Sequence, residues 1–136
     1  MKKRVLFVCT HNAGRSQMAE GYLNARYGER YEACSAGTEP REGLNSCAVR
    51  AMAEIGIDIS AQRSKHISTF AGEEMDVLVA VCEAGTCPLF PWAKETVQRS
   101  FPDPARLSGS EEEIMEGVRR IRDAIAAWID GTFGAV

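Results

Sequence analysis

The sequence of 136 residues has no long hydrophobic run, no excess of positive charge and no internal repeat. Its apolar runs are too short to span a membrane, and the run after Lys2-Lys3-Arg4 is too short for a signal peptide. The net charge of -3 gives no reason to expect nucleic acid as a partner. No linker rich in glycine, proline or serine divides the chain. We therefore expect one globular domain over residues 1–136, with neither a membrane nor a nucleic-acid partner.

Cysteine occurs in an odd number, five, without an export signal. Structural disulfides belong to oxidising compartments and use cysteines in pairs. This usage therefore indicates reactive or buried thiols in a cytoplasmic protein. Cys34 and Cys47 lie in apolar strand and helix patterns, so we predict that both are core residues.

Strand-like and helical patterns alternate along the chain, which is typical of βαβ units. The fold class predicted is α/β, a three-layer structure whose four-stranded parallel sheet is flanked by helices on both faces. The predicted strands are residues 5–8, 31–35, 76–81 and 96–101, the last an edge strand. The predicted helices are residues 16–27, 45–55 and a last helix that begins at the capping box Ser110–Glu113.

The most informative segment follows the first predicted strand. It reads Cys9, Thr10, His11, Asn12, Ala13, Gly14, Arg15 and Ser16. Its position is the carboxyl edge of the sheet, where open α/β folds bind ligands. Gly14 is expected to let the backbone curl into an anion nest, and Arg15 offers a planar fork for two oxygens. The positive end of the next helix adds to this field and favours a Cys9 thiolate. We interpret the segment as a nucleophile within an oxyanion-binding loop, although Cys9 alone would suggest a buried strand end.

A second cysteine pair, Cys82 and Cys87, follows the third predicted strand. Cys82 is expected at the same edge of the sheet as Cys9, because neighbouring parallel strands end there. The alternatives are two inert cysteines or half of a zinc site. Zinc needs four ligands, and neither His11 nor His66 has a ligand spacing to this pair, so we predict no metal.

Asp103 lies between two prolines just after the fourth predicted strand. The prolines restrict the backbone, which suits a positioned general acid. Taken alone, the residue would be interpreted as the cap of a turn. A cysteine and arginine loop at the same edge favours the acid, because a departing oxide needs a proton.

These residues resemble those of the thioredoxin-coupled arsenate reductases, which share the fold of the low-molecular-weight protein tyrosine phosphatases. The matching stretches are residues 9–20, Ser35-Ala36-Gly37, residues 56–60, Cys82 with Cys87, and residues 103–106. The resemblance implies that Cys9 attacks arsenate and that Asp103 protonates the departing oxygen. It further implies that Cys82 attacks Cys9 and releases arsenite, and that Cys87 then moves the disulfide to where reduced thioredoxin reduces it.

The resemblance also implies that no redox cofactor is bound, because the electrons arrive through thiols. Phosphate or sulfate is expected to occupy the arsenate loop, and the protein is expected to be a monomer. Asn12 and Ser16 match the polar groups that organise the loop and stabilise the thiolate. Asn12, Glu20 and Ser35 match a potassium site of some relatives, but Lys65 replaces its acidic residue. We expect the Lys65 ammonium to substitute for potassium.

Two features distinguish this chain from better-known reductases and from tyrosine phosphatases of the same fold. Only four residues lie between Cys82 and Cys87, which is fewer than in better-known reductases. Ala105 and Arg106 follow Asp103-Pro104, where a tyrosine phosphatase of this fold typically has aromatic residues that grip the substrate ring. The sequence thus favours the reductase, with phosphatase activity as a side reaction. A phosphatase and a non-catalytic regulator that binds anions or senses thiols remain the alternatives.

Overall fold

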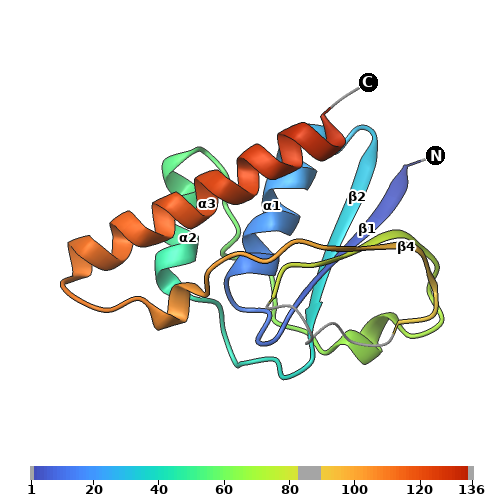
Figure 1. The fold of residues 1–136 in the computed structure, drawn as a ribbon, viewed down its shortest axis with the longest axis horizontal. Coiled ribbons are helices and arrows are strands. Elements are labelled where there is room, and N and C mark those ends of the chain that lie inside the picture. Colours follow the sequence, from blue (N-terminus) through green and yellow to red (C-terminus); the bar gives the residue numbers. More distant parts are fainter. Residues whose placement is uncertain (1, 83–89, 135–136) are drawn as a thin grey trace.

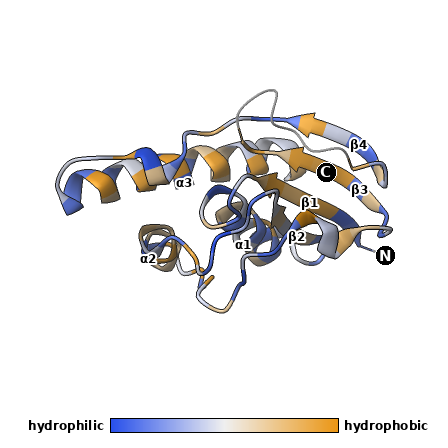
Figure 2. Cartoon of the chain, turned by 90° about the horizontal axis from the view of Figure 1, so that it is seen from below, coloured by the Kyte–Doolittle hydropathy of each residue, from blue (hydrophilic) through white to orange (hydrophobic). Residues whose placement is uncertain are grey.

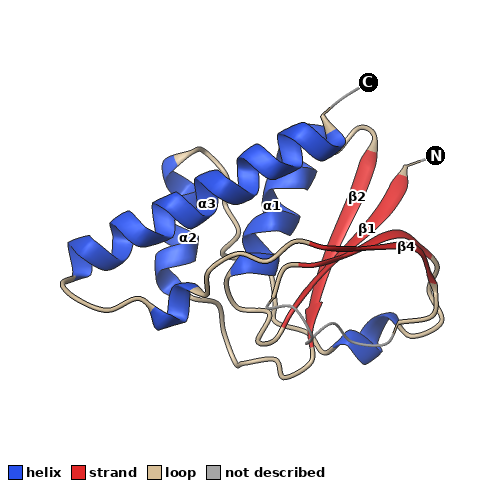
Figure 3. Ribbon diagram, in the orientation of Figure 1, coloured by secondary structure: helices blue, strands red, loops and turns tan. Residues whose placement is uncertain are grey.

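The computed structural model describes residues 2–82 and 90–134. Its centre is a sheet of four strands in the order β2-β1-β3-β4, and all neighbouring pairs are parallel (Figures 1 and 3). The strands are β1 (Lys3–Cys9), β2 (Tyr31–Gly37), β3 (Met75–Ala80) and β4 (Ala93–Gln98). The predicted parallel α/β sheet is therefore confirmed.

Strand β1 lies in the middle of the sheet because its side chains are apolar on both faces. Residues 5–8 have no exposed surface, and Cys9 at its carboxyl end is 2% exposed. Figure 2 shows hydrophobic residues along most of β1 and β3, whereas the edge strand β4 carries more hydrophilic residues. The sequence pattern thus placed the most apolar strands in the interior of the sheet.

Three α-helices of the described chain pack together against one face of the sheet (Figure 1). They are α1 (Arg15–Tyr27), α2 (Ser46–Glu54) and α3 (Glu111–Phe133). Val5, Phe7 and Val79 of the sheet share one buried cluster with the apolar stripe of α3. The predicted capping box is present at the start of α3, where the Ser110 and Glu113 side chains each bond the other residue's backbone. None of the helices described is long and apolar enough to cross a membrane.

The other face of the sheet is covered in part by a short 3₁₀ helix, Ile67–Phe70, drawn at the lower right of Figure 3. Phe70 and Phe90 pack there with Leu6 and Leu78 in a second buried cluster. The sheet thus separates two apolar clusters, with the long helices on the side that also carries Cys9.

Two details differ from the sequence-based expectations. Cys34 and Cys47 are half-buried at the margins of the two clusters and are not fully buried core residues. Strand β4 begins and ends three residues earlier than predicted. Phe101 still donates its N–H to the carbonyl of Val81 (3.2 Å), so the chain continues beside β3 after the regular strand has ended. Pro102 has no N–H with which to continue the ladder.

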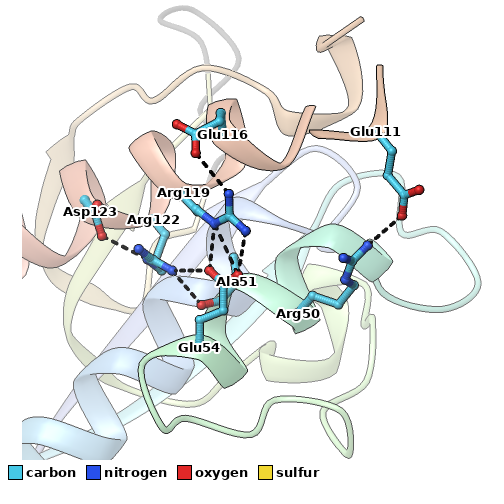
Figure 4. Close-up of polar contacts among 8 residues, drawn as sticks. All are labelled: Arg50, Ala51, Glu54, Glu111, Glu116, Arg119, Arg122 and Asp123. Carbon is cyan, nitrogen blue, oxygen red and sulfur yellow. Dashed lines mark hydrogen bonds and ion pairs between the residues drawn. The ribbon is translucent and has the colours of Figure 1, made fainter. Parts of the chain in front are cut away.

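A cluster of ion pairs holds α2 against α3 (Figure 4). Glu54 accepts hydrogen bonds from both Arg119 (2.8 Å) and Arg122 (3.0 Å) of α3. Arg50, one turn earlier on α2, pairs with Glu111 at 2.9 Å. The hydrogen bonds from Arg119 lower the pKa of Glu54 to about 2, with a further contribution from Arg122. Residues 41–45, which line the pocket described next, directly precede α2.

Candidate active site

The loop between β1 and α1 forms the floor of a pocket of about 150 Å³. This loop follows the carboxyl end of β1, where a parallel sheet presents its ligand sites. The pocket is lined by Cys9, His11, Ala13, Gly14, Arg15, residues 41–45, Asp103, Pro104 and Ala105. The structure therefore brings together the predicted nucleophile, the predicted arginine and the predicted acid.

The sulfur of Cys9 receives two polar contacts. Its Sγ lies 2.8 Å from Ser16 Oγ and accepts the backbone N–H of Asn12 at 3.2 Å. The amide of Asn12 donates to Ser16 Oγ at 2.8 Å. Either group can donate in the contact between Ser16 and Cys9, but a thiolate has no proton, so with a Cys9 thiolate the Ser16 hydroxyl is the donor. A thiolate at Cys9 would accept hydrogen bonds from both Ser16 and the Asn12 N–H.

Asn12 is the residue that turns the loop. It is fully buried and has a φ of 49°, in the left-handed region that asparagine tolerates. Its amide oxygen accepts from Gln17 Nε2 (2.9 Å) and from the N–H of Lys65 (2.8 Å). We had expected Gly14 to provide the turn, but the φ of Gly14 is −132°, so that expectation is wrong.

Gly14 is required for space instead. A Cβ atom at this position would lie 2.8 Å from Cγ of Pro104, in the wall that carries Asp103. Gly14 also precedes α1, which has no side-chain cap at its start. The first N–H groups of α1 are therefore available to an anion in the pocket.

Arg15 and Asp103 face each other across the pocket. Arg15 is 5% exposed and donates from Nη1 to the carbonyl of Phe101 at 3.1 Å. Its Nη2 lies 3.7 Å from Asp103 Oδ2. Asp103 also caps the 3₁₀ helix Pro104–Arg106 by accepting the N–H of Ala105 at 2.9 Å. The residue is thus both a turn cap and a pocket residue, the two interpretations that the sequence left in competition.

A polar layer supports the loop from below. Glu20 accepts a hydrogen bond from Ser35 Oγ at 2.7 Å, and burial raises the pKa of its carboxyl. The charge of Lys65 acts in the opposite direction on that carboxyl, so Lys65 lies within electrostatic reach of Glu20. The Lys65 ammonium itself donates to the carbonyl of Arg63. Ser35 is buried, whereas Glu20 and Lys65 are half-buried, so these residues form a partly buried polar group near Asn12.

The sequence reasoning missed two glutamines of this layer. Gln17 is fully buried, and its Nε2 bonds both oxygens of Asn12 and the carbonyl of Arg63. Gln62 donates to Gln17 Oε1 at 2.7 Å. Gln17 directly follows the loop and shares a helix face with Glu20 and Asn24, and this polar face is the signal that could have identified it.

A second element that the sequence reasoning missed is the wall formed by residues 41–45. The N–H groups of Glu39, Arg41 and Asn45 donate to the loop carbonyls of Thr10 (2.7 Å), His11 (3.1 Å) and Ala13 (2.8 Å), respectively. The His11 ring adds a hydrogen bond from Nδ1 to the Glu39 carbonyl (3.0 Å), since a carbonyl can only accept. This wall follows β2, so its position at the carboxyl edge of a parallel sheet was its available signal.

Cys82 comes two residues after β3 ends and is 3% exposed. It belongs to the same buried cluster as Cys9, and β3 pairs directly with β1. The structure thus places Cys82 at the predicted edge, whereas Cys87 lies outside the described residues. Within residues 2–82 and 90–134, no group of three or more histidine, cysteine or acidic side chains is arranged to hold a metal.

The sequence and the fold of this chain are similar to those of known proteins. The sequence profile described as "Low molecular weight phosphotyrosine protein phosphatase" matches residues 4–132. An arsenate reductase of Halalkalibacterium halodurans is 44% identical over 126 residues, which cover 91% of this chain and 90% of that protein. A solved arsenate reductase in its phosphate-binding state superposes with a TM-score of 0.83 at 30% identity, covering 97% of both chains. A Corynebacterium glutamicum thioredoxin-dependent arsenate reductase gives 0.67 at 27% identity, covering 98% of this chain and 64% of its own. The resemblance inferred from the sequence is confirmed.

Proposed function

We propose that this chain, which belongs to the low molecular weight phosphotyrosine protein phosphatase family, reduces arsenate to arsenite for arsenic detoxification. The observation that carries the proposal is the position of a second buried cysteine. Cys82 follows the strand next to β1 and shares a buried cluster with the pocket nucleophile Cys9. A phosphatase has no use for such a thiol, whereas a reductase needs two electrons from a thiol pair.

In the first step, the Cys9 thiolate attacks arsenic in an oxyanion held by the loop N–H groups and Arg15. The bond between arsenic and its hydroxyl oxygen breaks, and this hydroxyl takes one proton from Asp103 and leaves as water. Asp103 is suited to this because it lines the pocket with Cys9 and is held by the N–H of Ala105. Phosphate and sulfate have the same shape and charge, so they occupy the same loop.

In the second step, Cys82 attacks the sulfur of Cys9. A sulfur–sulfur bond forms, the sulfur–arsenic bond breaks, and its electron pair reduces arsenic, which leaves as arsenite. Cys87 then attacks Cys82 and releases Cys9, and reduced thioredoxin restores the Cys82–Cys87 pair. No bound redox cofactor takes part, and the cytoplasm is where reduced thioredoxin is expected. A relative described as thioredoxin-dependent supports this electron source.

Lys65 is proposed to make the loop independent of potassium. Its ammonium carries a fixed positive charge within electrostatic reach of Glu20. Exchanging sodium for potassium at constant ionic strength should therefore leave the turnover unchanged, whereas Lys65→Asp should make it potassium-dependent. Strong activation of the unmodified protein by potassium would contradict this role.

The second candidate function is a tyrosine phosphatase, which the family description itself favours. The pocket argues against it as the main activity, because none of its lining residues in the described chain is a phenylalanine, tyrosine or tryptophan. Ala105 stands in the wall beside Asp103, so a phosphotyrosine ring would have no stacking partner there. Slow hydrolysis of small phosphate esters is expected as a side reaction.

The test is arsenite production with thioredoxin, thioredoxin reductase and NADPH, run beside hydrolysis of para-nitrophenyl phosphate. Cys87→Ser should release about one equivalent of arsenite and then stop as a Cys9–Cys82 disulfide, identifiable by non-reducing peptide mapping. Cys82→Ser should release no arsenite by this route but should keep the ester hydrolysis. Cys47→Ser, at a half-buried cysteine outside the relay, is the matched control and should behave like the unmodified protein.

Two outcomes would contradict the proposal. Sustained thioredoxin-driven turnover in Cys87→Ser would reduce the relay to two cysteines. Efficient ester hydrolysis by the unmodified protein without any arsenite production would identify it as a phosphatase.

A further inference from the structure

Arg41 is a second arginine in the pocket. It is exposed and lines the same pocket as Cys9 and Arg15. No residue of the described chain makes a hydrogen bond or an ion pair with its side chain. Arg15, in contrast, is buried and already bonded to the Phe101 carbonyl.

The backbone of Arg41 is nevertheless held firmly against the loop. Its N–H donates to the carbonyl of His11 at 3.1 Å, and its neighbours in the wall are bonded to Thr10 and Ala13. The side chain therefore starts from a fixed point at the rim of the pocket. An arginine that is anchored by its backbone, and whose guanidinium has no partner in the described chain, can bind a planar or tetrahedral oxyanion.

The charged side chains that line the pocket indicate what the positive charge of Arg41 contributes. Glu42 lines the pocket, and so does Asp103 before it takes up the proton that it donates; each carboxylate opposes the entry of an anion. Arg15 lies 3.7 Å from Asp103 and compensates one of them. The positive charge of Arg41 offsets the second, so a doubly charged oxyanion enters a pocket that does not repel it.

The geometry of the first step decides which oxygen Arg41 meets. Displacement at a tetrahedral centre is in line, so the leaving oxygen lies opposite the attacking sulfur. Cys9 is buried on the floor, whereas residues 41–43 are exposed at the rim. The oxygen that points away from Cys9 therefore faces the rim where Arg41 stands.

We propose that Arg41 is a specificity-determining residue that contacts the outward oxygen of an inorganic tetrahedral oxyanion, which rests on the arsenate reductase function proposed above. In a phosphate ester that oxygen carries the organic group and no negative charge. Arg41 thus favours free oxyanions over esters, while the loop and Arg15 bind the three inner oxygens of both.

The test uses inorganic phosphate as the probe and does not need turnover. The rate at which iodoacetamide alkylates Cys9 is measured at increasing phosphate concentration, and the concentration that halves the rate gives Kd. Arg41→Gln should raise this Kd about tenfold, the loss of one charge-assisted contact. Arg41→Lys, which keeps the charge but not the fork, should raise it about threefold. Arg120→Gln removes the same charge from an exposed site on α3 outside the pocket and is the matched control.

The specificity is measured separately with KM for para-nitrophenyl phosphate. Arg41→Gln should change this KM by only about twofold, well below its effect on phosphate. The inference would be overturned if the phosphate Kd of Arg41→Gln were within twofold of that of Arg120→Gln. It would also be overturned if Arg41→Gln raised the phosphate Kd and the ester KM by the same factor. If phosphate protects Cys9 through Arg41 but arsenate is not reduced, the proposed function fails and the anion specificity of Arg41 stands.

Discussion

The hydroxyl of Ser16 offers the most direct test of how this pocket prepares its nucleophile. It lies 2.8 Å from the Cys9 sulfur, and its oxygen also accepts the Asn12 amide at 2.8 Å. Ser16→Ala removes this donor and leaves only the backbone N–H of Asn12 on the sulfur, at 3.2 Å. The substitution therefore isolates one hydrogen bond to the thiolate.

A hydrogen bond to a charged group contributes about 1.5–3 kcal/mol. Losing it should slow the alkylation of Cys9 by iodoacetamide at neutral pH by about 10- to 100-fold, and arsenate turnover by a similar factor. The substitution also leaves the buried Asn12 amide without its acceptor, which costs about 1–3 kcal/mol of unfolding free energy. We therefore expect a Tm lower by roughly 4–12 °C, measured by thermal unfolding.

Ser35→Ala is the matched control, because it removes a buried serine hydroxyl that donates to Glu20 (2.7 Å) and not to the sulfur of Cys9. Its alkylation rate should stay within about twofold of the unmodified protein. If Ser16→Ala alkylates as fast as Ser35→Ala, Ser16 does not stabilise the thiolate and the assigned direction of the hydrogen bond is wrong.

Three other substitutions test the acid, the loop and the helix contact. Asp103→Asn should slow both arsenate reduction and ester hydrolysis by about a hundredfold while phosphate still protects Cys9; an unchanged rate would leave Asp103 as a turn cap only. Gly14→Ala should push Pro104 away, because its Cβ would meet Cγ at 2.8 Å, and should lower kcat by about 10- to 100-fold with a smaller change in phosphate Kd. Glu54→Gln should lower Tm at neutral pH. Glu54 has its pKa lowered from 4.5 to about 2, so its stabilisation is complete above pH 4.5 and lost as pH falls through about 2. The Tm of the variant should depend less on pH over that range. A pH dependence identical to that of the unmodified protein would refute the pairing of Glu54 with Arg119 and Arg122.

The sequence by itself determined the elements and the identity of the loop. Apolar runs that alternate with helical patterns predicted a parallel sheet. The central strands of such a sheet are buried on both faces, and its strands are connected by crossovers. The strand, loop and helix order around Cys9 predicted an anion-binding pocket at this place, because the carboxyl end of a strand and the amino end of a helix meet there. The capping box of α3 is equally local and was predicted correctly.

Only the tertiary structure decided the contacts between segments far apart in the sequence. It assigned the left-handed turn to Asn12 rather than to Gly14, because the amide of Asn12 is held by Lys65, which follows it by 53 residues. It also showed that a glycine is needed at position 14 because Pro104 approaches closely there. It also placed Arg41 in the pocket wall through a hydrogen bond to His11. Such contacts depend on how the chain packs across the sheet, and periodicity along one segment carries no information about its distant neighbours.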